Sequence, residues 1–139
     1  MKPTYQLMDH TADLRIRVTG RDPADLFKNA GLALFDLICD ANTLTAAETN
    51  RIEVYGDDPA DLVVNYLREL LYLWTGHEKL VKMVQILGIS DTHVSASVTV
   101  DRYRPRRHTI LNEIKAVTYH QIEVTPSPSG WRATIVFDI

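Results

Sequence analysis

The chain contains two copies of one short segment, and this internal repeat constrains the fold more than any other feature. Residues 15–26 recur as residues 51–62, and nine of the twelve aligned pairs are identical. Further matches at the same offset extend the two copies to residues 15–37 and 51–73. A repeat with a fixed offset indicates one structural unit that is used twice. We therefore interpret the two longer segments as a duplication. The alternative is that two well-capped helix starts resemble each other without common descent.

Each copy has the pattern of a strand followed by a helix. Ile16 and Val18 alternate with polar residues, which is typical of a strand with one buried face. Asp22 is a candidate N-cap, because its carboxylate can accept hydrogen bonds from the free amides of the first helical turn. Pro23 then takes the first helical position, and Asp25 suits the positive end of the helix dipole. The second copy has the same residues in the same order: Ile52, Val54, Asp58, Pro59 and Asp61.

The remainder of the chain is rich in residues that favour strands. Residues 81–87 and 93–100 are separated by a turn signal, and residues 114–124 form a longer segment of the same character. A loop at residues 126–130 then precedes an alternating strand at the C-terminus. A length of 139 residues fits one domain. We predict a single α+β domain over residues 1–139, with duplicated strand–helix units and two amphipathic helices packed on antiparallel β-sheet.

The composition indicates a cytoplasmic protein. The formal net charge of −3 argues against a general DNA- or RNA-coating protein, which would be strongly basic. Cys39 is the only cysteine and lies among apolar residues, so we expect a buried thiol and no internal disulfide. The chain shows no signal peptide, and no apolar stretch approaches the roughly 18 residues that span a bilayer. We therefore expect a cytoplasmic protein that binds neither DNA nor a membrane.

An acidic segment precedes the first copy of the repeat. Asp9 and Asp13 offer hard oxygen ligands suited to Ca²⁺ or Mg²⁺, whereas His10 between them favours a transition metal. The alternative is that these residues cap a turn. Asp13 differs from the rest of the repeat, because the equivalent position of the second copy is Thr49. Its carboxylate therefore serves something that the duplicated unit does not itself require.

The C-terminus contributes two more carboxylates. Alternation along the last strand turns Asp138 away from the face of Phe137 and Ile139, and Ile139 also carries the free α-carboxylate. Two carboxylates on adjacent residues of a strand are able to hold a cation. The alternative is a chain end that finishes in aspartate without a function.

Two further segments carry residues capable of binding or chemistry. Four arginines lie beside Tyr103, namely Arg102, Arg104, Arg106 and Arg107. They could bind phosphate groups while the tyrosine stacks on a base, or they could pair with an acidic protein. The alternative is a solvated loop without a binding function. Residues 113–120 include Lys115 and His120, either of which is a candidate acid or base. The sequence nominates no catalytic triad to accompany them, and it contains neither a glycine-rich phosphate loop nor a Cys-x-x-Cys motif.

In this order along the chain, five segments resemble the signatures of the archease family. They are residues 9–14, 32–37, 65–73, 114–120 and 137–139. The resemblance covers the whole chain, and residues 114–120 are its most distinctive part. The match is poorest over residues 90–106, where the family more often has an acidic Gly-Glu turn and this chain has Val100 and Asp101 followed by arginines.

The resemblance implies a function that the composition does not reveal. Archeases assist the RtcB-type RNA ligase, which joins 2′,3′-cyclic phosphate or 3′-phosphate ends to 5′-hydroxyl ends with GTP and a divalent metal. The chain is then a protein cofactor and not an enzyme. It would promote guanylylation and repeated turnover of the ligase in tRNA splicing or RNA repair, and it would meet RNA only through the ligase.

The resemblance also implies a metal site and a fold. Family members bind a metal, usually assigned as calcium, and position nominates Asp13, Asp138 and the carboxylate of Ile139 as its ligands. Residues expected near this site are Asp9, His10, Lys115 and His120. The family fold consists of repeated strand–helix–strand units, which agrees with the internal repeat.

Three other functions compete with this expectation. The first is a chaperone or modulator of an RNA or protein methyltransferase, a role also proposed for the family. The second is a small metal-dependent phosphoesterase using Asp9, His10 and Asp13, which predicts turnover by the isolated protein. The third is direct RNA binding through residues 102–107, which predicts an affinity that falls steeply with salt.

Overall fold

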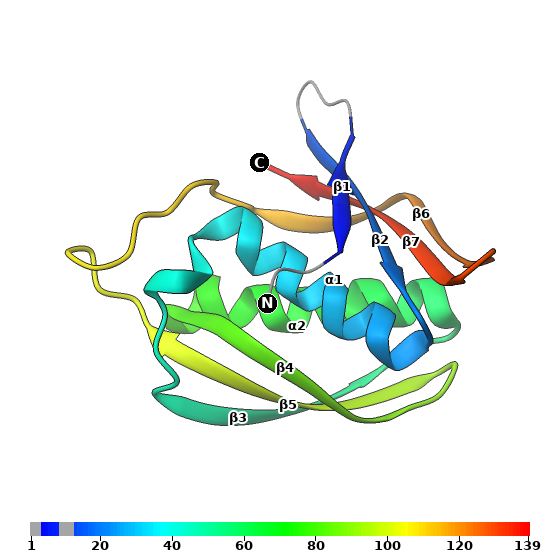
Figure 1. The fold of residues 1–139 in the computed structure, drawn as a ribbon, viewed down its shortest axis with the longest axis horizontal. Helices are drawn as coiled ribbons and strands as arrows, with labels where there is room; N and C mark the ends of the chain where they lie inside the picture. Colours follow the sequence, from blue (N-terminus) through cyan, green and yellow to red (C-terminus); the bar gives the residue numbers. More distant parts are fainter. Residues whose placement is uncertain (1–3, 9–12) are drawn as a thin grey trace.

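The computed structural model describes residues 4–8 and 13–139, apart from the side chains of residues 120 and 121. Figure 1 gives the order of the elements along the chain. They are β1 (Tyr5–Leu7), β2 (Asp13–Gly20), α1 (Pro23–Ile38), a short 3₁₀ helix (Ala41–Thr43), β3 (Glu48–Tyr55), α2 (Pro59–His77), β4 (Lys79–Ile89), β5 (His93–Arg102), β6 (Ala116–Ser127) and β7 (Gly130–Asp138).

The helices α1 and α2 form a layer between two antiparallel sheets (Figure 1). One sheet has the strand order β1-β2-β7-β6 and the other has the order β3-β5-β4. The first helix contacts β2 and β4, and the second contacts β6 and β3, so each helix packs on both sheets. The predicted α+β class, with two helices packed on antiparallel sheet, is confirmed. The division into two sheets was not predicted, and it separates the equivalent strands β2 and β3. Neither helix of the described ranges is long and apolar enough to cross a membrane.

The two copies of the repeat begin their helices in the same way. The side chain of Asp22 accepts a hydrogen bond from the amide of Asp25 at 2.8 Å, and Asp58 accepts one from Asp61 at 2.8 Å. Both caps have extended backbones, with φ and ψ of −149° and 174° at Asp22 and of −155° and 175° at Asp58. A proline follows each cap, as predicted. The two copies therefore share local geometry as well as sequence.

A glycine ends the strand of each copy for a steric reason. A Cβ atom on Gly20 would lie 2.3 Å from the backbone nitrogen of Leu26, and one on Gly56 would lie 2.6 Å from the Cα of Leu62. No side chain fits at either position, because the strand end and the first helical turn are nearly in contact. Identical glycines at these positions therefore allow the strand and the helix to pack closely.

Each helix of the repeat is also tied to its own strand. The side-chain amide of Asn29 donates to the carbonyl oxygen of Thr19 at 2.9 Å, and that of Asn65 donates to the carbonyl oxygen of Tyr55 at 2.9 Å. Each bond provides a partner for a carbonyl at the end of the strand, and it fixes the orientation of the helix against that strand.

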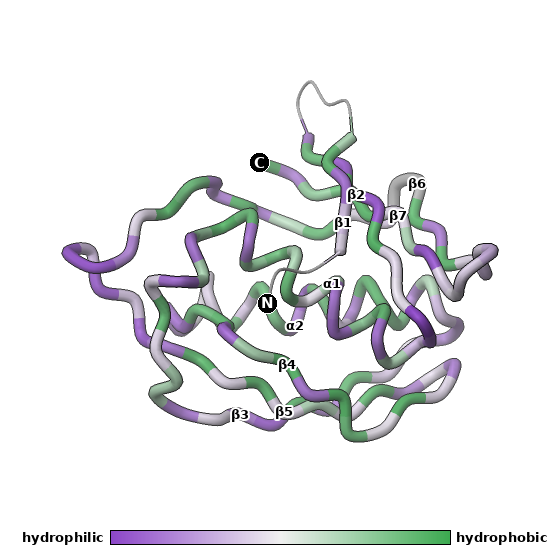
Figure 2. The backbone as a smooth tube through the Cα atoms, viewed as in Figure 1, coloured by the Kyte–Doolittle hydropathy of each residue, from purple (hydrophilic) through white to green (hydrophobic). Residues whose placement is uncertain are grey.

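The strands of the four-stranded sheet present one apolar face to the helices and one polar face outward. Along β2, the side chains of Leu14, Ile16 and Val18 are buried, whereas those of Arg15 and Arg17 are only partly covered. The backbone in Figure 2 accordingly changes repeatedly between hydrophobic and hydrophilic colours along the strands. The polar side, which we call the outer face, begins at Asp13 and continues through Arg15 and Arg17.

Cys39 closes the end of α1 and is buried, as predicted. Burial, together with the nearby carboxylates of Asp40 and Asp36, raises the pKa of the Cys39 thiol to about 11. The thiol is therefore protonated at neutral pH, and we assign it to the core.

The last hairpin is tighter than the predicted loop over residues 126–130. Strand β6 continues through Pro126 to Ser127, and β7 starts directly at Gly130 with a φ of +149°. Pro126 is accommodated because β6 is an edge strand, where a missing N–H leaves no neighbour unpaired. The predicted strand over residues 114–124 likewise begins later, at Ala116.

Candidate functional site

Asp13 and Asp138 lie opposite each other at one end of the four-stranded sheet. Asp13 is the first residue of β2 and Asp138 is the last residue of β7, and the antiparallel register pairs them directly. Directly opposite residues project from the same face of a sheet, with Cβ atoms about 4.5–5.5 Å apart. The strand register therefore brings together two carboxylates that are far apart in the sequence.

Neither carboxylate has a counter-ion in the part of the chain that the structure describes. No hydrogen bond or ion pair joins the side chain of Asp13 or Asp138 to a described residue, although Arg15 follows on the same face. Asp138 is exposed and Asp13 is partly buried. Like charges directly opposite each other destabilise a sheet. The pair is thus a position where a cation would relieve repulsion.

The third expected ligand, the carboxylate of Ile139, belongs to the residue beside this pair. Ile139 directly follows Asp138 and is 40% exposed, so it lies at the same end of the sheet. The three groups offer only oxygen, which is the preference of Ca²⁺ and Mg²⁺. Among the described side chains, no three His, Cys, Asp or Glu residues gather in one place. The chemistry of the donor set fits a hard divalent cation, provided that the terminus itself serves as a ligand.

Of the other residues nominated for this region, the structure places only Lys115 next to the aspartate pair. The backbone amide of Lys115 donates to the carbonyl oxygen of Asp138 at 2.8 Å, which puts the exposed Lys115 beside the aspartate pair. His120 lies in β6, where the register with β7 shifts, and its side chain is not among those that the structure describes. Asp9 and His10 lie outside the described residues.

The segment 114–120 is fastened to the second helix. The guanidinium group of Arg68 donates to the carbonyl oxygen of Val117 at 3.1 Å and lies 4.5 Å from the ring centroid of Tyr119. The hydroxyl of Tyr119 donates to Asp61 at 2.8 Å. These contacts give the most distinctive segment of the sequence a role in joining β6 to α2.

Three arginines of the outer face were not nominated from the sequence. Arg15 and Arg17 follow Asp13 at alternate positions of β2, and Arg132 lies on the neighbouring strand β7, paired with Thr19. The Nε atoms of Arg15 and Arg17 are buried without a hydrogen-bond partner in the described ranges. The alternation of charged and apolar residues from Asp13 to Arg17 was a visible signal for the first two, whereas the position of Arg132 depends on strand register.

The arginine-rich loop is largely occupied by contacts within the protein. Arg102 forms an ion pair with Glu48 at 3.3 Å, and Arg104 forms one with Asp101 at 3.3 Å. Arg107 donates to the carbonyl oxygen of Thr43 at 3.1 Å. Arg106 is exposed. The structure thus gives three of the four arginines an anchoring contact, and it places none of them on the outer face that carries Asp13.

A buried aspartate organises this loop. The carboxylate of Asp101 accepts from the backbone amide of Thr45 at 2.9 Å and lies 3.2 Å from Nε2 of His108. The amide of Arg104 donates to Nδ1 of His108 at 2.9 Å, so Nε2 carries the proton that reaches Asp101. Burial alone raises the pKa of Asp101, but the bonds from Thr45 and His108 outweigh it, and the pKa lies below its ordinary value.

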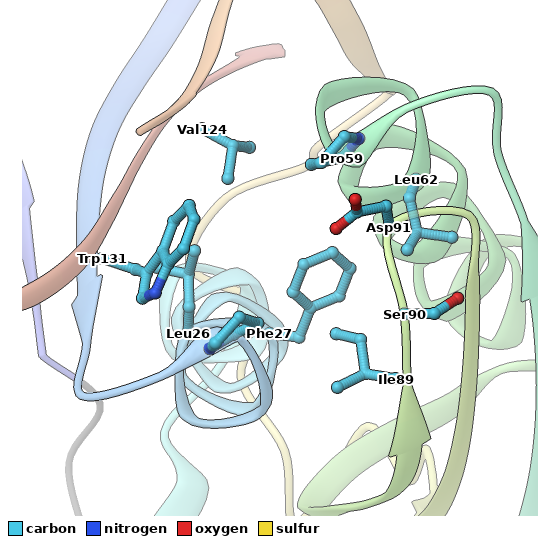
Figure 3. A pocket seen from close by; sticks show the side chains of 10 residues that line it. Leu26, Phe27, Pro59, Leu62, Ile89, Ser90, Asp91, Val124 and Trp131 are labelled. Carbon is cyan, nitrogen blue, oxygen red and sulfur yellow. The ribbon is translucent and has the colours of Figure 1, made fainter. Parts of the chain in front are cut away.

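A small apolar hollow lies at the opposite end of the molecule from the aspartate pair. It has a volume of about 170 Å³, and Figure 3 shows Trp131 and Phe27 beside it. Its lining includes equivalent residues of the two repeats, namely Pro23 with Pro59 and Leu26 with Leu62. The hollow therefore lies where the first turns of the duplicated helices approach each other. Trp131 pairs with Gly20, which is seven residues from Asp13 or about 23 Å along β2.

Comparison with known proteins identifies the family. The sequence profile of the Archease protein family (MTH1598/TM1083) matches residues 5–139. Protein archease of Methanosarcina barkeri is 33% identical over 139 residues, which cover 97% of this chain and 95% of that protein. Protein archease of Pyrococcus furiosus is 34% identical over 147 residues, which cover 97% of this chain and 98% of that protein.

Solved structures with the same fold agree with this match. The solution structure of Methanobacterium thermoautotrophicum protein 1598 has a TM-score of 0.81 at 27% identity, covering 97% of this chain and 98% of its own. The crystal structure of an archease from Thermotoga maritima, described as a possible chaperone, has a TM-score of 0.65 at 17% identity, covering 95% of this chain and 94% of its own. This likeness concerns the fold alone. The profile match and the full-length relatives show that the chain belongs to the archease protein family.

Proposed function

We propose that this protein activates an RtcB-type RNA ligase, and that Asp13, Asp138 and the carboxylate of Ile139 hold a divalent cation, Ca²⁺, for that purpose. One observation carries the proposal: the carboxylates of Asp13 and Asp138 lie opposite each other beside the chain terminus, without a described counter-ion. Membership of the archease family supports the ligase as the partner.

The location of the proposed metal site suits contact with a partner. Asp138 and Ile139 are exposed at the end of β7, where a partner protein could reach them. Ca²⁺ takes about six to eight oxygen ligands, more than three carboxylates supply if each binds through one oxygen. A bound cation would neutralise the carboxylates and leave positions for water or for an oxygen of the ligase.

The proposed role is that of a cytoplasmic protein cofactor, and the catalysed reaction belongs to the ligase. In this role the chain promotes guanylylation of the ligase and repeated turnover during tRNA splicing or RNA repair, and the ligase alone contacts the RNA. The description of the T. maritima protein as a possible chaperone supports a coarser version of the same role, in which an archease acts on another protein.

A guanylylation assay tests the proposal. Purified ligase is incubated with labelled GTP in the presence of Ca²⁺ and Mg²⁺, with and without this protein. The wild-type chain should accelerate guanylylation, and Asp13→Asn and Asp138→Asn should each reduce the acceleration at least about tenfold, because each removes one charged ligand. Glu69→Gln is the matched control, because it removes the same charge from an exposed site on α2.

The proposal fails if the ligase is guanylylated equally fast without this protein, or if Asp13→Asn activates it fully. Hydrolysis of phosphoesters by the isolated chain would instead support the phosphoesterase. Recovery of a methyltransferase in place of the ligase, in a pull-down from native lysate, would support the methyltransferase modulator.

A further inference from the structure

A second polar site lies on the outer face of the four-stranded sheet, away from the aspartate pair. A hollow of about 300 Å³ opens where β1, β2, β7 and the turn between β6 and β7 meet. Arg17 lines it, four residues along β2 from Asp13, or about 13 Å. The polar residues that line the hollow include Thr4, Arg17, Thr19, Ser127, Ser129 and Arg132.

Two arginines determine the charge of this hollow. Arg17 pairs with Thr134 and Arg132 pairs with Thr19, so the arginines are diagonal neighbours on adjacent strands and project from the same face. Diagonal neighbours have Cα atoms about 7–8 Å apart, a span that two long side chains can close on one small ligand. No Asp or Glu is among the described residues that line the hollow. The site is therefore cationic in a chain whose net charge is −3.

The arginines lack partners within the described ranges. The Nε atom of Arg17 is buried and has no hydrogen-bond acceptor there, and neither guanidinium group forms an ion pair with a described residue. Arg102 and Arg104 in the loop, by contrast, are both paired with carboxylates. Buried N–H groups in folded proteins are nearly always hydrogen-bonded. The two guanidinium groups thus have no described acceptor, and an anionic ligand in the hollow would supply one to their terminal N–H groups.

The remaining donors indicate the kind of anion. Hydroxyl groups of Thr4, Thr19, Ser127 and Ser129 come from three separate segments around the hollow. A carboxylate accepts hydrogen bonds mainly in one plane, whereas a phosphate group presents oxygens in tetrahedral directions and carries up to two negative charges. Donors arranged around a hollow, with two arginines among them, therefore match phosphate better than carboxylate. The volume also leaves room for an organic group beside the phosphate.

We propose that this hollow binds the phosphate group of a phosphate monoester, held by the guanidinium groups of Arg17 and Arg132. The site is separate from the aspartate pair and does not rest on the proposed activation of a ligase. It gives the outer face two functions, with an anionic end that attracts a cation and a cationic end that binds a phosphate.

Titration of the full chain by ¹H–¹⁵N NMR tests the site. The probes are inorganic phosphate, adenosine 5′-monophosphate and adenosine, with acetate at matched ionic strength as the carboxylate control. Amides of residues 17–19, 127 and 129–132 should shift with saturation on adding inorganic phosphate and, more tightly, the monophosphate. Arg17→Gln and Arg132→Gln should each weaken binding about tenfold or more, because each removes charge-assisted hydrogen bonds. The same spectra report whether each variant is folded.

Arg15→Gln is the matched control, because Arg15 lies on the same face with a buried unpaired Nε but does not line the hollow. It should leave the affinity within about twofold. Equal weakening by Arg15→Gln, equal shifts with acetate, or no saturable shift with either phosphate would each overturn the site. Binding of inorganic phosphate without the monophosphate would overturn its assignment to an ester. Metal-free buffer keeps the result independent of the aspartate pair.

Discussion

Replacing Asp101 by alanine should lower the free energy of unfolding by about 3–5 kcal/mol, because it removes a buried charged acceptor whose hydrogen bonds are each worth about 1.5–3 kcal/mol. The carboxylate is fully buried and accepts from the amide of Thr45 at 2.9 Å and from Nε2 of His108 at 3.2 Å. The substitution leaves both donors without an acceptor, and the buried donor Nε2 of His108 alone then costs about 1–3 kcal/mol. The ion pair with Arg104 adds little, because that side chain is 58% exposed.

Urea unfolding followed by circular dichroism at pH 7 measures this loss. Glu69→Ala is the control on an exposed helix surface, and it should change the free energy of unfolding by less than about 0.5 kcal/mol. A loss below about 1 kcal/mol for Asp101→Ala would refute the reasoning, because it would mean that the buried network contributes no more than an ordinary surface contact.

The same network predicts a dependence on pH. Burial raises the pKa of Asp101, but the bonds from Thr45 and His108 lower it more, so the folded pKa lies below the unfolded value of about 3.9. The associated stability is present above the unfolded pKa and is lost as the pH falls through the folded pKa. Wild-type protein should therefore lose stability more steeply in acid than Asp101→Asn, and parallel acid curves would contradict this assignment.

Further substitutions test three other parts of the structure. Gly20→Ala should lower the free energy of unfolding by about 1–3 kcal/mol or more, because its Cβ would lie 2.3 Å from the helix backbone. Gly88→Ala is the control, because a Cβ there would have nothing within 4 Å, and it should not show this steric cost in thermal unfolding. Asp22→Ala and Asp58→Ala should each cost about 1 kcal/mol in urea unfolding, and a clear difference between them would contradict equivalent caps. Asp13→Asn should raise the stability of the metal-free protein by about 0.2–1 kcal/mol, because it removes a like-charge pair; a lower melting temperature without metal would contradict that repulsion.

Local features of the fold were predictable because they depend on neighbouring residues. Each cap requires only a carboxylate, a following proline and a helix. The structure has the predicted cap at Asp22 and the predicted cap at Asp58. The burial of Cys39 follows from its apolar surroundings. Alternation identified most strands, but it shows only that a strand has one buried face. Alternation does not show which strands are neighbours, so the separation of β2 and β3 into two sheets could not be predicted from the sequence.

The residues of the candidate site could be nominated from the sequence, but their arrangement in space could not. Asp13 was singled out because Thr49 replaces it in the second copy, and the carboxylates at the C-terminus were visible from the chain end. Their proximity depends on the register between β2 and β7, which pairs residues from opposite ends of the chain. Arg132 was missed because its position depends on the same register. Arg17 was missed because it belongs to no run of basic residues, although the alternation of charged and apolar residues around it was visible. The conspicuous run at residues 102–107 is instead held mostly by contacts within the protein.

Calorimetric titration with Ca²⁺ tests the central claim most directly, because it measures the metal site without a ligase. The wild-type chain should bind with one saturable site. Asp138→Asn should weaken binding at least about tenfold, and so should an extension of several residues after Ile139, which removes the terminal carboxylate from its position. Glu69→Gln should bind like the wild type. A wild-type chain that binds no divalent cation, or an extended chain that binds Ca²⁺ as tightly as the wild type, would contradict the account.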